Sequence, residues 1–303
     1  MQLKISVNFV ELYLNQTPCG IGPLAALLFG VKMFQEKILY VPNIDGQQTS
    51  KQNPPNYRSP ASRNLKYQPI SIKHDSIELK GWFIQQEQST QVPTLIFFHE
   101  NAGNLGYRLD YFEKYYYNLK CNVVAVAYRG YDESTGSPNQ IGIQKDAIAI
   151  VRYVFSSLEI DKNNVFIHGR SLGGAVAIYA ANYFQDSKKE KIKAVILENT
   201  FTSINDVVND LVPNLRVSNL LFSRNQWRSC DTIKNIKLPI LFISSGQDEL
   251  VSYNHMKTLI QKSENCQIKH EYHIAEGDHN GNWMKDEGAY FQNIQKFFQS
   301  ITN

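Results

Sequence analysis

Short apolar runs, each followed by a turn and then a helical pattern, organise most of the chain. Five runs consist mainly of Val, Ile, Leu, Phe and Ala: Thr94–His99, Asn122–Tyr128, Val165–His168, Ala194–Leu197 and Pro239–Ser244. Strands that lack polar alternation are covered on both faces, as parallel sheets require. The helical patterns are long enough for crossovers: Leu109–Leu119, Gln140–Leu158, Leu172–Phe184 and Tyr253–Ser263. This alternation predicts the α/β class, with a mostly parallel, doubly wound sheet.

Different patterns mark the ends of this region and one interruption within it. Gln68–Lys73 and Ile77–Gln85 alternate apolar and polar residues, which predicts an antiparallel pair. Ile268–Ala275 predicts a last strand, and Gly288–Ile301 a last helix. Phe201–Lys237 contains weak helical patterns and no convincing strand. We expect this insertion, residues 201–237, to form a small helical cap over the strand ends.

The first 66 residues differ from the rest. Residues 1–36 include the mostly apolar stretch Cys19–Phe34. Pro23 and Lys32 limit its uninterrupted part to far less than the ~20 residues of a spanning helix. We therefore expect residues 1–36 to associate with a membrane or with a partner protein. Residues 37–66, rich in Gln, Asn, Pro and Ser, are predicted to be an extended linker, and residues 67–303 the globular domain.

Charge and cysteine content argue against several functions. A formal net charge of +3 over 303 residues, without clustered cations, gives no reason to expect nucleic-acid binding. Cys19, Cys121, Cys230 and Cys266 lie far apart, which suits reduced thiols in an intracellular protein. The sequence has no His/Cys cluster with metal-ligand spacing, no G-x-G-x-x-G and no P-loop. We expect neither a metal nor a cofactor.

The segment Ile167–Gly174 (I-H-G-R-S-L-G-G) places Ser171 between a predicted strand and a predicted helix. G-x-S-x-G alone arises by chance, but at such a corner it is typical of a nucleophile elbow. A serine nucleophile needs a histidine base that a carboxylate orients. Asp248 and His279 follow in the order Ser, Asp, His, in loops after strands, where open α/β sheets place ligands. Glu198 is an alternative to Asp248 as the acid.

An acyl-transfer site also needs backbone donors for the oxyanion. One donor is expected to be the N–H of Leu172, and the candidate for the other is Asn101, in the loop after the first all-apolar strand. No substrate-binding residue is assigned. Apolar cap residues such as Leu211, Leu221 and Phe222 predict a pocket for a hydrophobic chain.

Several motifs in combination resemble one known family. H-E-N-A-G-N, Y-R-G-Y, G-R-S-L-G-G-A-V-A-I, E-N-T-F and H-N-x-x-W are similar to motifs of the Bem46-like serine hydrolases, near α/β-hydrolase domain-containing protein 13. The resemblance runs from about Lys37 to the C-terminus. It implies an α/β-hydrolase fold, a triad of Ser171, Asp248 and His279, and an N-terminal membrane anchor in many members. Related branches act on acyl esters or thioesters, including palmitoylated proteins.

The resemblance thus implies a serine hydrolase for an ester, thioester or amide of a small acyl substrate or an acylated protein. The expected location is intracellular and membrane-associated, at a mitochondrion or endomembrane. Three positions depart from the family, and one of them is Ala127, which replaces an acidic residue. Glu100 replaces a glycine beside the oxyanion loop, where a carboxylate would repel the developing charge, and Asp132 replaces another glycine. These departures leave open an alternative: a catalytically weakened hydrolase-fold protein that is an accessory subunit of a membrane-associated complex.

Overall fold

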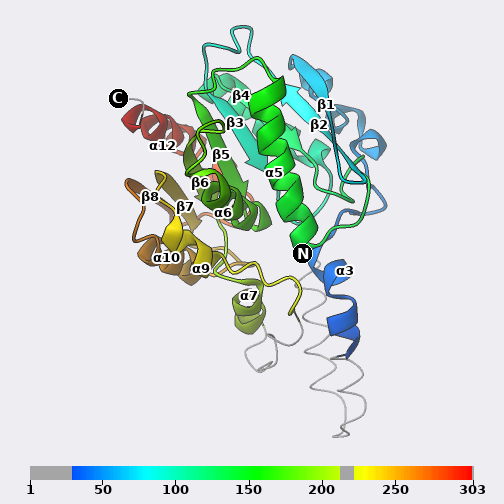
Figure 1. The fold of residues 1–303 in the computed structure, drawn as a ribbon, viewed down its shortest axis with the longest axis vertical. Helices are drawn as coiled ribbons and strands as arrows, with labels where there is room; N and C mark the ends of the chain where they lie inside the picture. Colours follow the sequence, from blue (N-terminus) through cyan, green and yellow to red (C-terminus); the bar gives the residue numbers. More distant parts are fainter. Residues whose placement is uncertain (1–28, 212–221, 302–303) are drawn as a thin grey trace, which may run out of the picture.

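Within residues 29–211 and 222–301, which the computed structural model describes, eight strands form one sheet in the order β1-β2-β4-β3-β5-β6-β7-β8 (Figure 1). The strands are β1 (Tyr67–His74), β2 (Ile77–Ile84), β3 (Thr94–Phe98), β4 (Asn122–Val126), β5 (Val165–Arg170), β6 (Ile192–Glu198), β7 (Ile240–Ser245) and β8 (Lys269–Ile274). β2 pairs antiparallel with β1 and β4, and all other neighbours are parallel. The predicted mostly parallel α/β sheet is confirmed.

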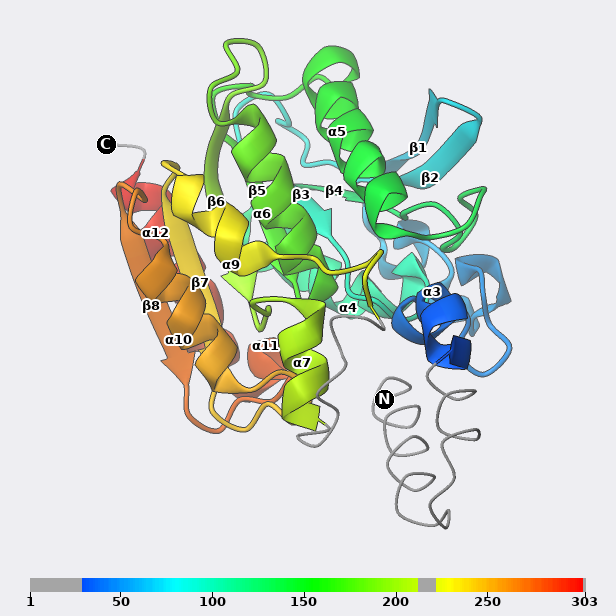
Figure 2. The same cartoon turned by 60° about the horizontal axis from the view of Figure 1, so that its bottom comes forward.

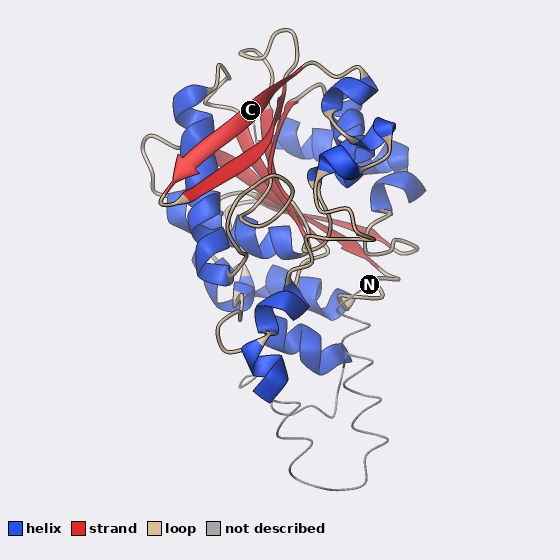
Figure 3. Cartoon of the chain, turned by 90° about the vertical axis from the view of Figure 1, so that its right-hand side faces the viewer, coloured by secondary structure: helices blue, strands red, loops and turns tan. Residues whose placement is uncertain are grey.

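Helices cover both faces of the sheet (Figures 1 and 2). One face carries α5 (Gln140–Ser157), α6 (Leu172–Phe184) and α10 (Tyr253–Lys262), and the other carries α4 (Leu109–Lys114) and α12 (Glu287–Ser300). Figure 3 shows the sheet from the side between these layers. Every residue of β3 and β4 is buried, whereas exposed and half-buried residues alternate along most of the edge strand β8. Burial on both faces explains the continuous apolar runs of the central strands.

Three short helices lie beyond the carboxyl ends of the parallel strands, where ligands bind in such sheets. They are α3 (Gln35–Leu39), α7 (Ile204–Leu211) and α11 (Asn282–Lys285) (Figures 1 and 2). The predicted cap, residues 201–237, contributes α7, α9 (Ser229–Thr232) and, in its described part, no strand. Leu221 and the stretch Cys19–Leu28 lie outside the described residues.

Residues 37–66 pack against the domain, in contrast to the extended linker that their composition predicts. Leu39, Tyr40 and Leu65 belong to the hydrophobic core. The segment also contains three short 3-10 turns: Ser50–Gln52, Pro55–Tyr57 and Pro60–Arg63. Composition misled here because Gln, Asn and Ser side chains satisfy one another and the domain through hydrogen bonds.

Asp132 attaches this segment to the domain. Its carboxylate accepts hydrogen bonds from the N–H and hydroxyl of Ser50, at 2.9 and 3.1 Å, and from the N–H of Leu105, at 3.0 Å. The backbone of Asp132 has φ 48°, in the left-handed region that glycine adopts most readily. Asp is among the residues that tolerate this region, and here its carboxylate also anchors the segment to the domain.

Candidate active site

Ser171 lies at the sharp corner between β5 and α6. Its φ of 54° and ψ of −120° are strained for a residue with a side chain. Three hydrogen bonds hold the corner: Ser171 N–H donates to the carbonyl of Glu198 at 2.9 Å, and the Ser171 carbonyl accepts from Thr200 Oγ1 at 2.7 Å and from Gly174 N–H at 2.9 Å. The sequence pattern at this corner predicts such a turn, and the backbone has the geometry of a nucleophile elbow.

Two glycines make this corner possible. A Cβ on Gly169 would lie 2.0 Å from the carbonyl oxygen of Gly173, and a Cβ on Gly173 would lie 1.9 Å from that of Phe98. Both distances are far below van der Waals contact. Any side chain at Gly173 would therefore push α6 away from the end of β3. It would also push α6 away from the loop after β3, which carries Asn101.

His279 and Asp248 meet at the same end of the sheet. His279 Nδ1 lies 2.7 Å from Asp248 Oδ2, and the two side chains are 5% and 2% exposed. The other carboxylate oxygen of Asp248 accepts from the N–H groups of Leu250 and Val251, at 2.9 and 2.8 Å. These bonds fix the carboxylate and, through it, the orientation of the imidazole.

Glu198, the alternative acid, has different partners. Its carboxylate accepts from Tyr290 Oη at 2.8 Å and from Asn282 Nδ2 at 3.1 Å, and lies 3.2 Å from His168 Nε2. The group is fully buried beneath the site. Burial raises the pKa of Glu198, but the bond with His168 and the charge of Arg170 outweigh this and hold the pKa below its usual range. The structure therefore places Asp248, and not Glu198, against His279.

Ser171 and His279 border one cavity of about 60 Å³. Among the described residues, Ser171 Oγ and His279 Nε2 have no hydrogen-bond partner, including each other. The two residues therefore border the same cavity without being hydrogen-bonded to each other. In ligand-free enzymes the bond between nucleophile and base is often long and tightens when substrate binds.

The two expected oxyanion donors border the same cavity. Leu172 is the first residue of α6, so its N–H has no partner within the helix. Asn101 has no hydrogen-bond acceptor for its N–H within the described residues. Its carbonyl, in contrast, accepts from Val41 N–H at 2.9 Å and Tyr131 Oη at 2.7 Å, and its Nδ2 donates to the Leu39 carbonyl at 3.0 Å. These contacts hold the peptide in place.

Leu39–Val41 is thus a part of the site that sequence reasoning missed. Val41 bridges Ala102 in parallel, and Leu39 and Tyr40 line the cavity. The three consecutive apolar residues before the polar stretch were a weak signal. Nothing in the sequence indicates their partner, because the pairing joins segments about sixty residues apart in the chain.

Glu100 is paired with two buried arginines. Arg108 Nε donates to its carboxylate at 2.7 Å, and Arg170 donates to the other oxygen. Burial raises the pKa of Glu100, but the charges of Arg170 and Arg108 outweigh it and hold the pKa below its usual range. The repulsion that an unpaired carboxylate would cause at the oxyanion loop is therefore offset. Arg170 also donates to the carbonyl of Asn280 at 3.3 Å, beside His279.

Leu211 and Phe222 do not border the cavity, although the cap pattern suggests them for a hydrophobic pocket. The apolar lining instead comes from Leu39, Phe201, Ile204, Val207, Leu250 and Val251. No group of three or more potential metal ligands occurs among residues 29–211 and 222–301. No helix in this described part is long and apolar enough to cross a membrane.

The sequence is similar to proteins from plants and fungi. It is 37% identical over 281 residues to the alpha/beta hydrolase domain-containing protein WAV2 of Arabidopsis thaliana, covering 88% of both chains. It is 34% identical over 284 residues to protein bem46 of Schizosaccharomyces pombe, covering 92% of this chain and 91% of that one. The uncharacterized membrane protein YNL320W of Saccharomyces cerevisiae is 34% identical, with 79% and 82% covered.

Family and structure comparisons agree. Residues 131–303 match the prolyl oligopeptidase family, Peptidase_S9. An α/β hydrolase from Vibrio vulnificus superimposes with a TM-score of 0.69 at 20% identity, covering 86% of this chain and 92% of that one. The Pyrococcus furiosus esterase Pf2001 gives a TM-score of 0.64 at 15% identity, with 81% and 96% covered. The predicted fold is confirmed.

Proposed function

Because the chain belongs to the Bem46-like α/β hydrolases, we propose that it is a serine hydrolase that cleaves an ester, thioester or amide through an acyl-Ser171 intermediate. The observation that carries this proposal is the His279–Asp248 pair, which opens onto the same cavity as Ser171. Buried ion pairs of this kind also occur as structural elements. Here the pair faces a strained serine and two N–H groups without acceptors among the described residues, which a purely structural role does not require.

The residues divide the reaction between them. As Ser171 Oγ attacks the acyl carbon, His279 Nε2 takes its proton, and the new oxyanion accepts from the N–H groups of Asn101 and Leu172. His279 then protonates the leaving group as its bond to the acyl carbon breaks. Water then attacks the acyl carbon while His279 takes a proton from it. His279 returns this proton to Ser171 Oγ as the bond between the acyl carbon and Oγ breaks, which releases the carboxylic acid. Asp248 keeps the Nδ1 proton of His279 in place throughout.

Labelling by a fluorophosphonate probe tests this assignment. The probe forms a covalent bond with a serine that a base activates, so wild type should label and Ser171→Ala should not. Ser223→Ala, which changes an exposed serine, is the matched control and should label like wild type. Equal labelling of wild type and Ser171→Ala, or a wild type that neither labels nor hydrolyses p-nitrophenyl acetate, would remove the proposal.

We also propose that residues 1–36 attach the protein to an intracellular membrane. Three apolar side chains near this end are largely exposed, Phe29 at 65%, Met33 at 50% and Phe34 at 56%, and the yeast relative is named a membrane protein. Exposed apolar clusters mark association sites. Phe34→Asp should reduce flotation of the full chain with phosphatidylcholine vesicles. Met284→Asp, at a methionine that is 62% exposed elsewhere, should not.

A further inference from the structure

The cavity beside Ser171 is small and apolar. Its volume is about 60 Å³. Ser171 and His279 border it, and most of the other side chains around it are aliphatic or aromatic. A buried apolar cavity of about 150 Å³ holds one benzene molecule, which has six carbon atoms. By proportion, the cavity at Ser171 has room for about two or three carbon atoms.

Two aromatic side chains from distant segments form part of the cavity wall. Tyr40 follows α3, and Trp227 precedes α9; they are 3% and 2% exposed. Trp227 Nε1 donates to Tyr40 Oη at 3.0 Å, and Tyr40 Oη donates to Asn225 Oδ1 at 2.8 Å. Asn225 Oδ1 also accepts from Gln140 N–H at 2.9 Å, and Trp227 N–H donates to Gln140 Oε1 at 2.9 Å. Buried hydrogen bonds therefore hold both rings in place. If either ring rotated, buried polar atoms would lose their partners.

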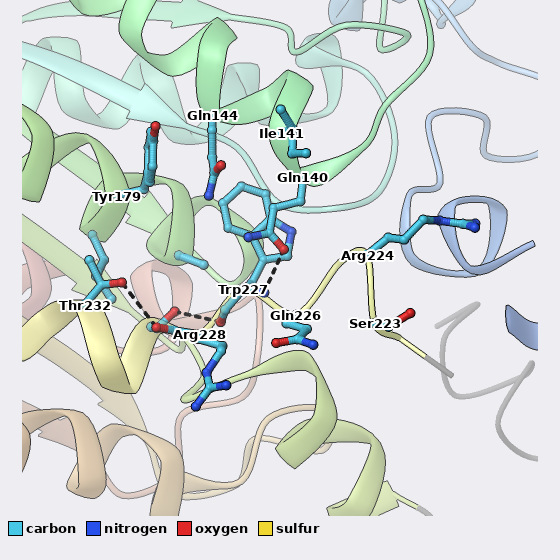
Figure 4. A pocket seen from close by; sticks show the side chains of 13 residues that line it. Gln140, Ile141, Gln144, Tyr179, Ser223, Arg224, Gln226, Trp227, Arg228 and Thr232 are labelled. Atoms are coloured by element: carbon cyan, nitrogen blue, oxygen red, sulfur yellow. Dashed lines mark hydrogen bonds between the residues drawn. The ribbon is translucent and has the colours of Figure 1, made fainter. Parts of the chain in front are cut away.

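Larger spaces lie behind both rings. Tyr40 also borders a cavity of about 920 Å³, lined by Met33, Phe34 and Ile141 among others. Trp227 borders a cavity of about 270 Å³ next to Gln140 and Tyr179. Figure 4 shows Trp227 in the wall of that second cavity, with its bond to Gln140 dashed. Tyr40 thus lies between the small cavity at Ser171 and a largely apolar space that a longer chain could fill, and Trp227 closes the small cavity toward a more polar space.

From this geometry we propose, resting on the serine-hydrolase function above, that Tyr40 and Trp227 set the acyl-chain length. The substrates are acetyl and propionyl esters, thioesters or amides, whose short chain lies against Leu39, Ile204 and Val207. Longer acyl chains meet the Tyr40 and Trp227 rings and are excluded. The cavity of about 920 Å³ is reached when the Tyr40 ring is removed.

We call the Tyr40 and Trp227 rings the gate. A series of esters with acyl groups of increasing length tests it. The kcat/KM of wild type for p-nitrophenyl esters should be highest for the two- and three-carbon acyl groups and fall at least tenfold by eight carbons. Tyr40→Ala should raise the ratio of eight-carbon to two-carbon kcat/KM at least tenfold. Tyr40→Phe keeps the ring and should keep the wild-type preference. Phe34→Ala, which changes the large cavity but not the small one, is the matched control and should do the same.

The outcomes separate the gate from the catalytic proposal. If wild type prefers acyl groups of eight or more carbons, the gate is refuted, whether or not Tyr40→Ala folds. A folded Tyr40→Ala protein with an unchanged ratio also refutes it. In both cases fluorophosphonate labelling of Ser171 would still support the hydrolase. If wild type neither reacts with the fluorophosphonate probe nor hydrolyses any of the esters, the proposed function itself is refuted.

Discussion

Replacing Glu100 by glycine, which the related family has at this position, tests whether the carboxylate harms or supports the site. Glu100, Arg108 and Arg170 have side chains that are 8%, 7% and 7% exposed. Removing the carboxylate leaves two guanidinium groups without their shared counter-charge in a place that excludes water. Breaking a buried ion pair in this way costs about 3–5 kcal/mol. We expect Glu100→Gly to lower the free energy of unfolding by this amount and to slow labelling of Ser171.

Urea unfolding, followed by tryptophan fluorescence, measures the loss, and fluorophosphonate labelling of the same samples measures the site. At about 2 °C per kcal/mol for a chain of this size, the Tm should fall by about 6–10 °C. Glu133→Gly is the matched control. Glu133 pairs with Lys51 at the surface, where the side chains are 37% and 74% exposed. Such a pair contributes about 1 kcal/mol at most. Faster labelling of Glu100→Gly at unchanged stability would show that the pairing argument is wrong.

The same carboxylate predicts a pH dependence. Burial raises the pKa of Glu100 in the native state, but the charges of Arg170 and Arg108 outweigh it and hold this pKa below its usual range. The unfolded chain binds the proton more readily, so the stabilisation is complete above the unfolded pKa of about 4.3 and is lost as pH falls through the native pKa. Below about pH 4.3 the Tm of wild type should therefore approach that of Glu100→Gln. A constant Tm difference between pH 7 and pH 3 would contradict the assignment.

Three further substitutions test the geometry of the site. Gly173→Ala should destabilise the protein by about 1–3 kcal/mol and abolish labelling, because its Cβ would lie 1.9 Å from the Phe98 oxygen; normal labelling would contradict this. Asp248→Asn should lower kcat about 10⁴-fold with little change in Tm, whereas a loss below tenfold would mean that another group orients His279. Asp132→Gly relieves the positive φ but leaves buried N–H groups without acceptors, so urea unfolding should show a net loss of about 1–3 kcal/mol, and a gain would refute the anchor.

The sequence predicted the bounds of helices and strands best where the residues of an element are buried along its whole length. Leu172–Phe184 has the same bounds in the prediction and in α6, and Thr94–His99 exceeds β3 by one residue. A strand that is covered on both faces must be apolar throughout, so its limits are visible in the composition. Asp248 and His279 were predictable for a different reason: Asp248 follows the buried strand β7 and His279 follows the edge strand β8, each in a loop of a few residues. The parallel sheet brings the ends of these two strands together.

Contacts between distant segments were not predictable. The partners of Glu100 come from two elements, Arg108 from the turn before α4 and Arg170 from the end of β5. Neither arginine has a spacing that identifies its partner. Tyr40 likewise reaches Trp227 through a hydrogen bond between residues that are 187 positions apart. Sequence reasoning identified Ser171, Asp248 and His279, which the structure brings to one end of the sheet, and it missed the side chains that surround them.

The alternative of a catalytically weakened accessory subunit rests on Glu100 and Asp132, and the structure changes what both imply. The charge of Glu100 is paired with two arginines, and Asn101, which borders the cavity, has no acceptor for its N–H among the described residues. Asp132 occupies a left-handed conformation and binds Leu105, which follows the Asn101 loop. Val41 supports that loop from its other side. The loop that lacks the family's glycine is thus held by contacts on both sides, and the charge of Glu100 is paired, so neither substitution is by itself a physical reason to expect an inactive site.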